Sequence, residues 1–344
     1  DLHSFPTRRS SDLEPAAWSQ TTRQWVGTAA SSWALTTNWT TVPGGAFGVP
    51  EAGDIIVFGN GTGITVNNVP TITLSGLIVE IGTEVTLTSG ANNKITISNG
   101  ANAIDFKVDA GSELELGAGV DIFLKVDELV RASIAGLFTV SAGQAYVADL
   151  NGVSTSVTGT IQNRGLVTGT TTRLLFLAGS NYVHDLDEGD IPDASWDPAS
   201  TCRITGTIFD GPRYLNRPFG NFVWDCPGQK RVAKLAASGM SVAGTLSVVN
   251  TGESRLEMDD NSLTVGNLSL SGGTFLMANG FLDIGFPIPF AMNRTLDVTG
   301  NVTIENDATL LMSTDDLGGL GRLNISGNFT QNGGTITEIG RAHV

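Results

Sequence analysis

The feature of the sequence that most constrains its fold is an internal repeat in the C-terminal third of the chain. In each copy a short alternating strand pattern ends in Gly-Asn or Gly-Thr, and a second strand pattern follows at once. The copies span residues 240–248, 263–270, 296–304 and 323–330, with glycines at 244, 266, 300 and 327. The spacing of these glycines matches one coil of a β-solenoid, in which stacked coils bury side chains that one coil cannot bury alone.

A third strand pattern follows the later copies, at 274–277, 309–312 and 335–337, and weaker copies of the repeat occur at 74–78, 157–161 and 204–208. Together these patterns predict an all-β fold: a right-handed parallel β-solenoid, or β-helix, with about three strands per coil and roughly a dozen coils. A sandwich or barrel built from hairpins is the alternative, because alternating strands occur in both.

The repeat glycines should form a row near one corner of the solenoid. Glycine permits the sharp bend or positive φ that other residues resist, and the Asn beside it can bond its own backbone. Parallel pairing should dominate, because each strand meets its counterpart in the next coil.

The composition agrees with a β-rich body. With 43 Gly, 40% hydrophobic and 15% charged residues, the chain is too apolar for disorder and too rich in Gly for a helical protein. No apolar run reaches the roughly 20 residues that span a bilayer. Helical spacing is confined to 126–134, where Val126, Leu129, Val130 and Ile134 predict a short surface turn of helix.

The net charge of −15 constrains the partners. Lys and Arg are scattered and form no patch that could neutralise a run of phosphates, so the sequence argues against nucleic acid and anionic membrane surfaces as partners. We expect no transmembrane segment, no cofactor and a monomeric chain.

Residues 14–53 are rich in Trp, with Trp25, Trp33 and Trp39 before the first regular strand. A solenoid must cover the open end of its core, and large aromatic side chains are suited to that. We interpret 14–53 as an N-terminal cap or lead-in segment, with a carbohydrate-stacking platform as the alternative.

A second segment, 181–229, also breaks the repeat. We interpret it as an irregular insertion, or as the seam between two solenoid parts at 54–180 and 230–337. The spacing of Cys202 and Cys226 along the chain is close to the length of one coil. It predicts proximity in neighbouring coils and a candidate disulfide if the protein is exported.

The same segment is acidic and contains weak calcium candidates in Asp185, Asp187 and Asp190. Their spacing lacks the glycine and the terminal glutamate of an EF-hand loop. A solvated acidic loop is therefore the favoured interpretation, and the sequence contains no metal signature.

The sequence shows no catalytic constellation. A nucleophilic triad needs a histidine or an equivalent base, and the one histidine outside the terminal runs is His184. A β-helical polysaccharide lyase or glycosidase would need paired carboxylates, for which the candidates are Asp259, Asp260, Asp297, Asp315 and Asp316. Adjacent strand residues point to opposite faces, and no basic cluster accompanies these carboxylates, so we predict that the chain is not an enzyme.

Two stretches resemble a known family. One contains Trp25-Val-Gly-Thr, Ser32-Trp33, Asn38-Trp39, Val49-Pro50 and Gly53-Asp54-Ile55-Ile56, and the other is Phe219-Gly-Asn-Phe-Val-Trp-Asp-Cys-Pro-Gly-Gln229. Both are similar to elements of large repetitive β-helical exoproteins of Bacteroidetes-type bacteria. The resemblance implies type IX secretion with a C-terminal sorting domain, and a location outside the cell or on its outer surface.

The terminal runs 1–13 (DLHSFPTRRSSDL) and 338–344 (EIGRAHV) resemble translated sequencing-adapter DNA, which recurs in environmental assemblies. We expect both runs to be non-native tails that lie outside the regular stack. The sequence between them would then be a fragment of a longer reading frame.

The expected function is a non-catalytic extracellular or cell-surface scaffold or stalk, adhesin-like in its repetition, with surface glycans or cell-envelope components as candidate partners. The alternatives are a glycan-binding adhesin and a β-helical polysaccharide lyase or glycosidase. An exposed row of aromatic side chains on one face would favour the adhesin. A face of Thr, Ser and Asn would favour the stalk.

Overall fold

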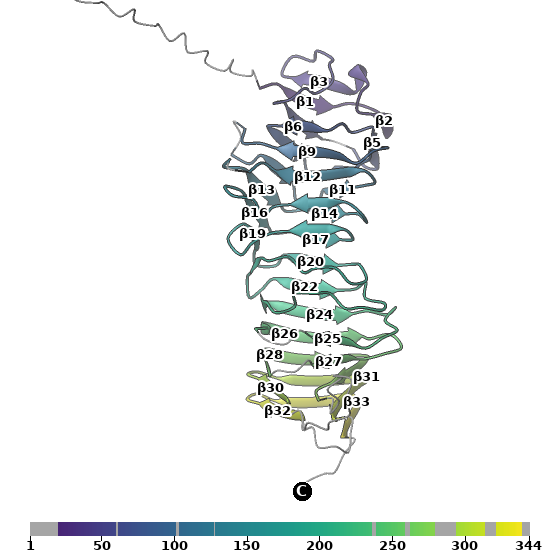
Figure 1. Cartoon of the computed structure of the whole chain (residues 1–344), viewed down its shortest axis with the longest axis vertical. Coiled ribbons are helices and arrows are strands. Elements are labelled where there is room, and N and C mark those ends of the chain that lie inside the picture. Colours follow the sequence, from purple (N-terminus) through teal and green to yellow (C-terminus); the bar gives the residue numbers. More distant parts are fainter. Residues whose placement is uncertain are drawn as a thin grey trace, which may run out of the picture.

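The computed structural model of the chain describes residues 20–59, 61–100, 103–126, 128–235, 239–258, 262–278, 294–313 and 321–338. Short strands stack into one elongated body, with β1 (Thr22–Trp25) and β3 (Trp39–Val42) at one end and β32 (Gly321–Ile325) and β33 (Phe329–Glu338) at the other (Figure 1). Among the paired strands of these residues, only β1 and β3 run antiparallel. The predicted parallel β-solenoid is confirmed.

Three rows of strands form the sides of the first part. Sheet A contains, in spatial order, β3, β1, β4 (Ile55–Phe58), β7 (Gly76–Val79), β10 (Phe106–Val108), β13 (Arg131–Ile134), β16 (Ser154–Val157), β19 (Leu174–Phe176) and β21 (Ser195–Trp196). Sheet C contains β6 (Ile72–Leu74), β9 (Asn93–Ile97), β12 (Val120–Leu124), β15 (Ala145–Val147) and β18 (Leu166–Thr168).

Sheet B forms the third side and continues along the whole stack. Its main column contains β2 (Ala30–Ser32), β5 (Ile64–Asn67), β8 (Glu84–Leu87), β11 (Glu113–Leu116), β14 (Leu137–Val140), β17 (Thr160–Asn163), β20 (Asn181–His184), β22 (Thr201–Ile204), β24 (Asn221–Asp225), β26 (Ser241–Asn250), β28 (Leu263–Leu270), β31 (Val302–Ser313) and β33. The described residues contain no α-helix; η1 (Thr36–Asn38) is a single 3-10 turn.

The coils of the C-terminal part also have three sides. On one side β23 (Pro218–Phe219) and β30 (Arg294–Val298) pair with the first halves of the long strands β26 and β28, and β30 pairs with β32. On the other side β25 (Ala233–Leu235), β27 (Leu256–Met258) and β29 (Thr274–Leu276) lead to the second half of β31. The C-terminal coils therefore also contain about three strands each, as predicted.

Alternating side chains explain why these segments are strands. In β8, Val85 and Leu87 are buried and Glu84 is exposed. The register keeps inward residues in columns, because Val85 pairs with Leu114 and Leu114 pairs with Phe138 in successive coils. Burying each such side chain stabilises the fold by roughly 1.5–3 kcal/mol. The burial requires stacking, because a single coil leaves these side chains in contact with water.

The repeat glycines form the expected row. The N–H of Gly300 donates to the carbonyl of Gly266 at 2.6 Å, and the N–H of Gly327 donates to that of Gly300 at 2.9 Å. The reason for glycine is close approach and not positive φ, because a Cβ at Gly266 would lie 2.3 Å from the carbonyl oxygen of Ala243. The corner therefore excludes any larger residue.

Gly220 extends the row, because its carbonyl accepts the N–H of Gly244 at 2.7 Å. The asparagines beside the row glycines bond to the next coil and not, as we expected, to their own backbone. Asn221 Oδ1 accepts the N–H of Thr245 at 3.0 Å, and Asn267 Oδ1 accepts that of Asn301 at 2.9 Å. Asn301 Oδ1 accepts the N–H of Asn328 at 2.9 Å. These amides tie neighbouring coils together at the corner.

The interpretation of 181–229 as an insertion is wrong. Within it β20, β22 and β24 continue sheet B in parallel register, and β21 closes sheet A. The segment does mark a change in cross-section, because sheet C ends at β18 and loops occupy that side until β25. The acidic loop 185–194 is the first of these loops.

The predicted helical turn at 126–134 is also wrong. Residues 131–134 form β13, in which Ala132 and Ile134 point inward and Ser133 points outward. Val126 and Leu129 are exposed. Pairing with β10 and β16 in adjacent coils overrides a helical spacing that spans only a short segment.

The described tryptophans of the N-terminal segment, Trp25, Trp33 and Trp39, pack together inside the end of the stack. The rings of Trp25 and Trp39 meet edge to face with centroids 4.9 Å apart, and the indole N–H of Trp39 donates to the carbonyl of Trp33 at 2.8 Å. Trp25, Trp33 and Trp39 are 3%, 1% and 0% exposed. The carbohydrate-stacking alternative for these rings is therefore wrong.

The expected tails fall largely outside the described residues, which begin at 20 and end at 338. One boundary needs correction, because Glu338 is the last residue of β33 and pairs with Ser313. In the described part of the chain we find no helix long and apolar enough to cross a membrane.

Candidate functional site

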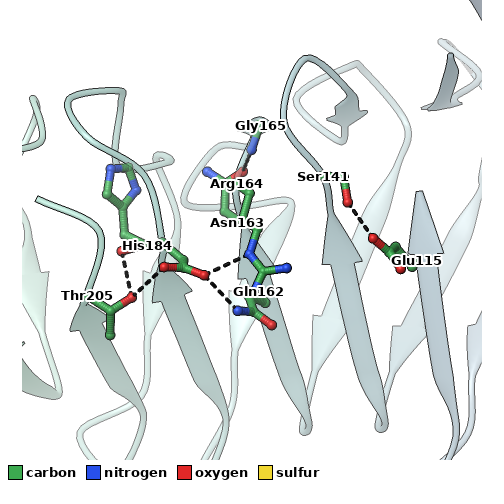
Figure 2. Close-up of polar contacts among 9 residues, drawn as sticks. Glu115, Ser141, Gln162, Asn163, Arg164, Gly165, His184 and Thr205 are labelled. Atoms are coloured by element: carbon green, nitrogen blue, oxygen red, sulfur yellow. Dashed lines mark hydrogen bonds and ion pairs between the residues drawn. The ribbon is translucent and has the colours of Figure 1, made fainter. Parts of the chain in front are cut away.

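Polar side chains on the outward face of sheet B are bonded from coil to coil along the stack. Glu115 of β11 accepts hydrogen bonds from Thr86 of the preceding coil at 3.3 Å and from Ser141 of the next coil at 2.7 Å. Figure 2 shows this contact of Ser141 beside a second group centred on the coils of β17 and β20. Arg203 and Asp225 form a further ion pair between β22 and β24.

Asp185 is the centre of the second group. Its carboxylate accepts from Arg164 Nε at 2.7 Å, from Gln162 Nε2 at 2.9 Å and from the hydroxyl of Thr205 at 3.3 Å (Figure 2). Burial acts to raise the pKa of Asp185, but these hydrogen bonds and the guanidinium outweigh it and hold the pKa below its usual value. The carboxylate links three coils and already accepts three hydrogen bonds from protein donors.

Asp187 has a different set of partners. Its Oδ1 accepts the backbone N–H groups of Ile208, Phe209 and Asp210 at 2.7, 2.8 and 3.1 Å. Partial burial acts to raise its pKa, and the three N–H groups, together with the charge of Arg231, lower it below the usual value. Asp187 therefore fixes the loop of the next coil.

Asp190 is the third calcium candidate. Its Oδ1 accepts a hydrogen bond from Arg213 Nε at 2.6 Å. The three carboxylates thus bind separate protein donors and do not converge. No group of three or more His, Cys, Asp or Glu residues within the described ranges is arranged to hold a metal ion.

His184 lies in a buried chain of hydrogen bonds. Asn163 Nδ2 donates to the hydroxyl of Tyr182 at 2.8 Å, the hydroxyl lies 3.3 Å from His184 Nδ1, and His184 Nε2 lies 2.6 Å from the carbonyl oxygen of Glu188. Because a carbonyl can only accept, Nε2 carries the proton and Nδ1 accepts from Tyr182. Burial lowers the pKa of His184 and keeps it neutral. With no exposed surface, it cannot act as a base on a substrate.

The predicted disulfide is wrong. Both cysteines are free and buried. Cys202 pairs with Phe222, and Ile204 with Trp224, so Cys226 lies four positions beyond the partner of Cys202, about 13 Å along the strand. A disulfide tolerates a Cα separation of no more than about 7 Å. The spacing of the cysteines was misleading because this coil is shorter than the chain segment that separates them.

The carboxylates that we weighed for glycosidase or lyase chemistry are not brought into a site by the described residues. Asp297 accepts a hydrogen bond from Asn324 of the next coil at 2.7 Å. Asp259, Asp260, Asp315 and Asp316 lie outside the described residues.

One acidic feature was missed by our sequence reasoning. A shallow depression of about 180 Å³ on sheet B is lined by Glu84, Glu113, Glu115 and three threonines, Thr65, Thr86 and Thr139. Glu84 and Glu113 are register partners in neighbouring coils. None of the described residues that line the depression is basic, so it offers carboxylates alone, and Glu115 already accepts hydrogen bonds from Thr86 and Ser141.

Comparison with known proteins gave no match, either to a protein-family model, to a curated protein or to a solved structure.

Proposed function

We propose that this chain is a non-catalytic scaffold or stalk that acts outside the cell or on its surface. The observation that carries the proposal is that the outward polar side chains of sheet B bond between coils. Glu115, Asp185 and the corner asparagines each connect one coil to the next. Side chains used in this way stabilise a rod and leave few free groups for chemistry.

Hydroxyl side chains stand on the outward face of sheet B near both ends of the stack, as a stalk would present them. Thr65, Thr86 and Thr139 lie in one outward column of the first part, and Ser247, Ser269 and Thr303 continue that column in three successive coils of the last part. In the four coils between them the column holds Gln162, Val183, Arg203 and Val223. The four exposed aromatic side chains, Phe47, Phe209, Tyr214 and Phe329, form no row along one sheet of the described structure.

The proposal that the chain is not a catalyst is tested with a panel of neutral and acidic polysaccharides. The chain is incubated with each polysaccharide, and new reducing ends and unsaturated uronides are measured. We expect no product above that of the heat-denatured chain. Cleavage that scales with protein and disappears in Glu113→Gln would overturn it. Asn324→Ala serves as the matched surface control, because its exposed side chain bonds to Asp297 and does not line the depression.

The location is tested on intact cells that produce the natural protein. An antibody against the folded solenoid should label intact cells or the culture medium to the same extent as lysed cells. Labelling that requires lysis would contradict an extracellular scaffold.

A further inference from the structure

Two neighbouring loops form the most aromatic part of the exposed surface. Loop 205–217 follows β22 and loop 226–232 follows β24. Because these strands are parallel and in register, both loops leave sheet B on the same side (Figure 1). Phe209 is 44% exposed and Tyr214 is 54% exposed, and Ile208 and Val232 beside them are also exposed.

The backbone that carries Phe209 is fixed from both neighbouring coils. On one side, Asp187 accepts the N–H groups of Ile208, Phe209 and Asp210. On the other side, the N–H of Lys230 donates to the carbonyl of Ile208 at 2.7 Å. An exposed ring on a fixed backbone loses little conformational entropy on binding, which favours recognition of a ligand.

Tyr214 is held in an unusual conformation. Its φ of 60° lies in the left-handed region, which a bulky side chain rarely adopts. The residues on either side are anchored: the N–H of Arg213 donates to the carbonyl of Gly189 at 2.8 Å, and Leu215 is buried. Strain of this kind persists where the surroundings impose it, and it is concentrated at binding sites.

The cations around these rings divide into paired and unpaired groups. Arg213 pairs with Asp190 at 2.6 Å and Arg217 with Asp193 at 3.2 Å. Lys230 and Arg231 form no ion pair within 4 Å of a described carboxylate, although the charge of Arg231 acts on Asp187 from further away and helps to lower its pKa. They lie 6.0 and 5.4 Å from the centroid of the Phe209 ring. Two adjacent cations without a close carboxylate therefore lie beside an exposed ring in a chain of net charge −15.

We propose that Phe209, Lys230 and Arg231 form a binding site for an acidic polysaccharide whose sugars carry carboxylates, and that Tyr214, on the same loop as Phe209 with Arg217 5.9 Å from its ring centroid, extends the site along the polysaccharide. A sugar ring presents an apolar face that packs on an aromatic ring, and its carboxylate accepts a forked hydrogen bond from a guanidinium. Charge complementarity with the unpaired cations selects carboxylated over neutral sugars. Repulsion from the remaining acidic surface is screened beyond about 8–10 Å at physiological salt.

This binding site goes beyond the scaffold role, because it would let the solenoid hold a ligand. It needs no catalytic residue. The direct test is the affinity of the purified chain for polygalacturonate, measured by affinity electrophoresis and calorimetry in the presence of EDTA. Dextran is the neutral comparison. We expect binding to polygalacturonate that weakens as salt is added, and at least tenfold weaker binding to dextran.

Three variants locate the site: Phe209→Ala, Tyr214→Ala and the double variant Lys230→Gln/Arg231→Gln. Each should weaken polygalacturonate binding by about tenfold or more, with an unchanged circular dichroism spectrum. The matched controls are Phe329→Ala and Arg322→Gln, an exposed aromatic and an exposed cation at the far end of the stack, which should bind as the parent does.

Four results would count against the proposal. The first is no binding of polygalacturonate at all. The second is equal loss of affinity in the control variants and the site variants. The third is binding that disappears when EDTA is added, because the polysaccharide would then be held through calcium and not through Lys230 and Arg231. Equal affinity for dextran would remove the charge selection and also count against the assignment.

Discussion

At the scale of single residues, the side chains that hold this solenoid together are small amides used repeatedly. Asn221, Asn267 and Asn301 each present a side-chain oxygen to a backbone N–H of the next coil. The row is interrupted at Thr245, which occupies the corner of its coil but has no side-chain amide. Each bond is worth about 0.5–1.5 kcal/mol, and its value lies in repetition along the axis.

Replacing one of these amides should weaken the contact between two coils. Asn301→Ala removes the acceptor of the Asn328 N–H, and we expect the free energy of unfolding to fall by about 1 kcal/mol, measured by urea denaturation. Asn332→Ala is the matched control, because its exposed side chain makes no hydrogen bond with the described residues. An equal loss in both variants would show that the corner amide has no special role.

His184 should make stability depend on pH near neutrality. Burial lowers its pKa below the usual 6.5, while Glu188, Asp190 and Asp185 act in the opposite direction. The unfolded chain therefore takes up a proton at a higher pH than the folded chain does. The stabilisation is complete above about 6.5 and is lost as the pH falls below that value.

The measurement is urea unfolding at about pH 7.5 and about pH 5. The parent chain should lose more stability over this interval than His184→Gln, which cannot titrate. Asp185 and Asp187, whose pKa values are lowered from 3.8, contribute their losses at more acidic pH. Identical pH dependence in the parent and His184→Gln would contradict the assignment of a neutral buried histidine.

At the scale of strands and coils, close stacking at the corner decides which residues fit. A Cβ on Gly266 would lie 2.3 Å from the carbonyl oxygen of Ala243 and 2.4 Å from that of Gly244. Both obstacles are backbone atoms of the preceding coil, so neither can move without disturbing the pairing of β26 with β28.

Gly266→Ala should therefore lower the free energy of unfolding by about 3 kcal/mol, the range of an overpacked core. Gly90→Ala is the control, because a Cβ there meets no atom within 4 Å. Urea midpoints of the two variants give the comparison. A Gly266→Ala chain as stable as Gly90→Ala would mean that the coils separate easily at this corner.

The sequence predicted the type of coil but not the register between coils. The recurrence of Gly at 244, 266, 300 and 327 is visible without a structure, and the row is present. In the region 181–229, however, the inward positions hold His184, Cys202 and Trp224 in place of Leu, Val and Ile. Inward alternation is hard to detect there because these residue types also occur in loops.

Register could not be predicted because coils differ in length. Glu84 faces Glu113 and Cys202 faces Phe222, and the first pair is separated by a much longer stretch of chain than the second. A side-chain cluster assembled across coils, such as the acidic depression, depends on these individual offsets. An average spacing places it incorrectly, as the prediction for Cys202 and Cys226 shows.

At the scale of the whole molecule, a solenoid is a series of coils that touch only their neighbours. Stability is then close to a sum of coil and interface contributions, and a coil with one neighbour is held less firmly than a coil with two. In β17, Ile161 has 0% exposure, whereas the last strand, β33, begins with Phe329 at 43% exposure. The described stack is therefore predicted to open from the β33 end.

Hydrogen exchange followed by mass spectrometry tests this gradient. Among the strands of sheet B, peptides that cover β33 should exchange fastest, and peptides that cover β28 should exchange more slowly. Peptides that cover β14 and β17 should exchange slowest, because all the coils between them and β33 must separate first. A conservative weakening of the last interface, Leu323→Ala, should accelerate exchange in β33 and β31 and leave β14 unchanged, since nearest-neighbour coupling does not reach that far. If Leu323→Ala accelerates every peptide equally, the coils unfold as one cooperative unit, and the description of the chain as a stack of semi-independent coils would be wrong.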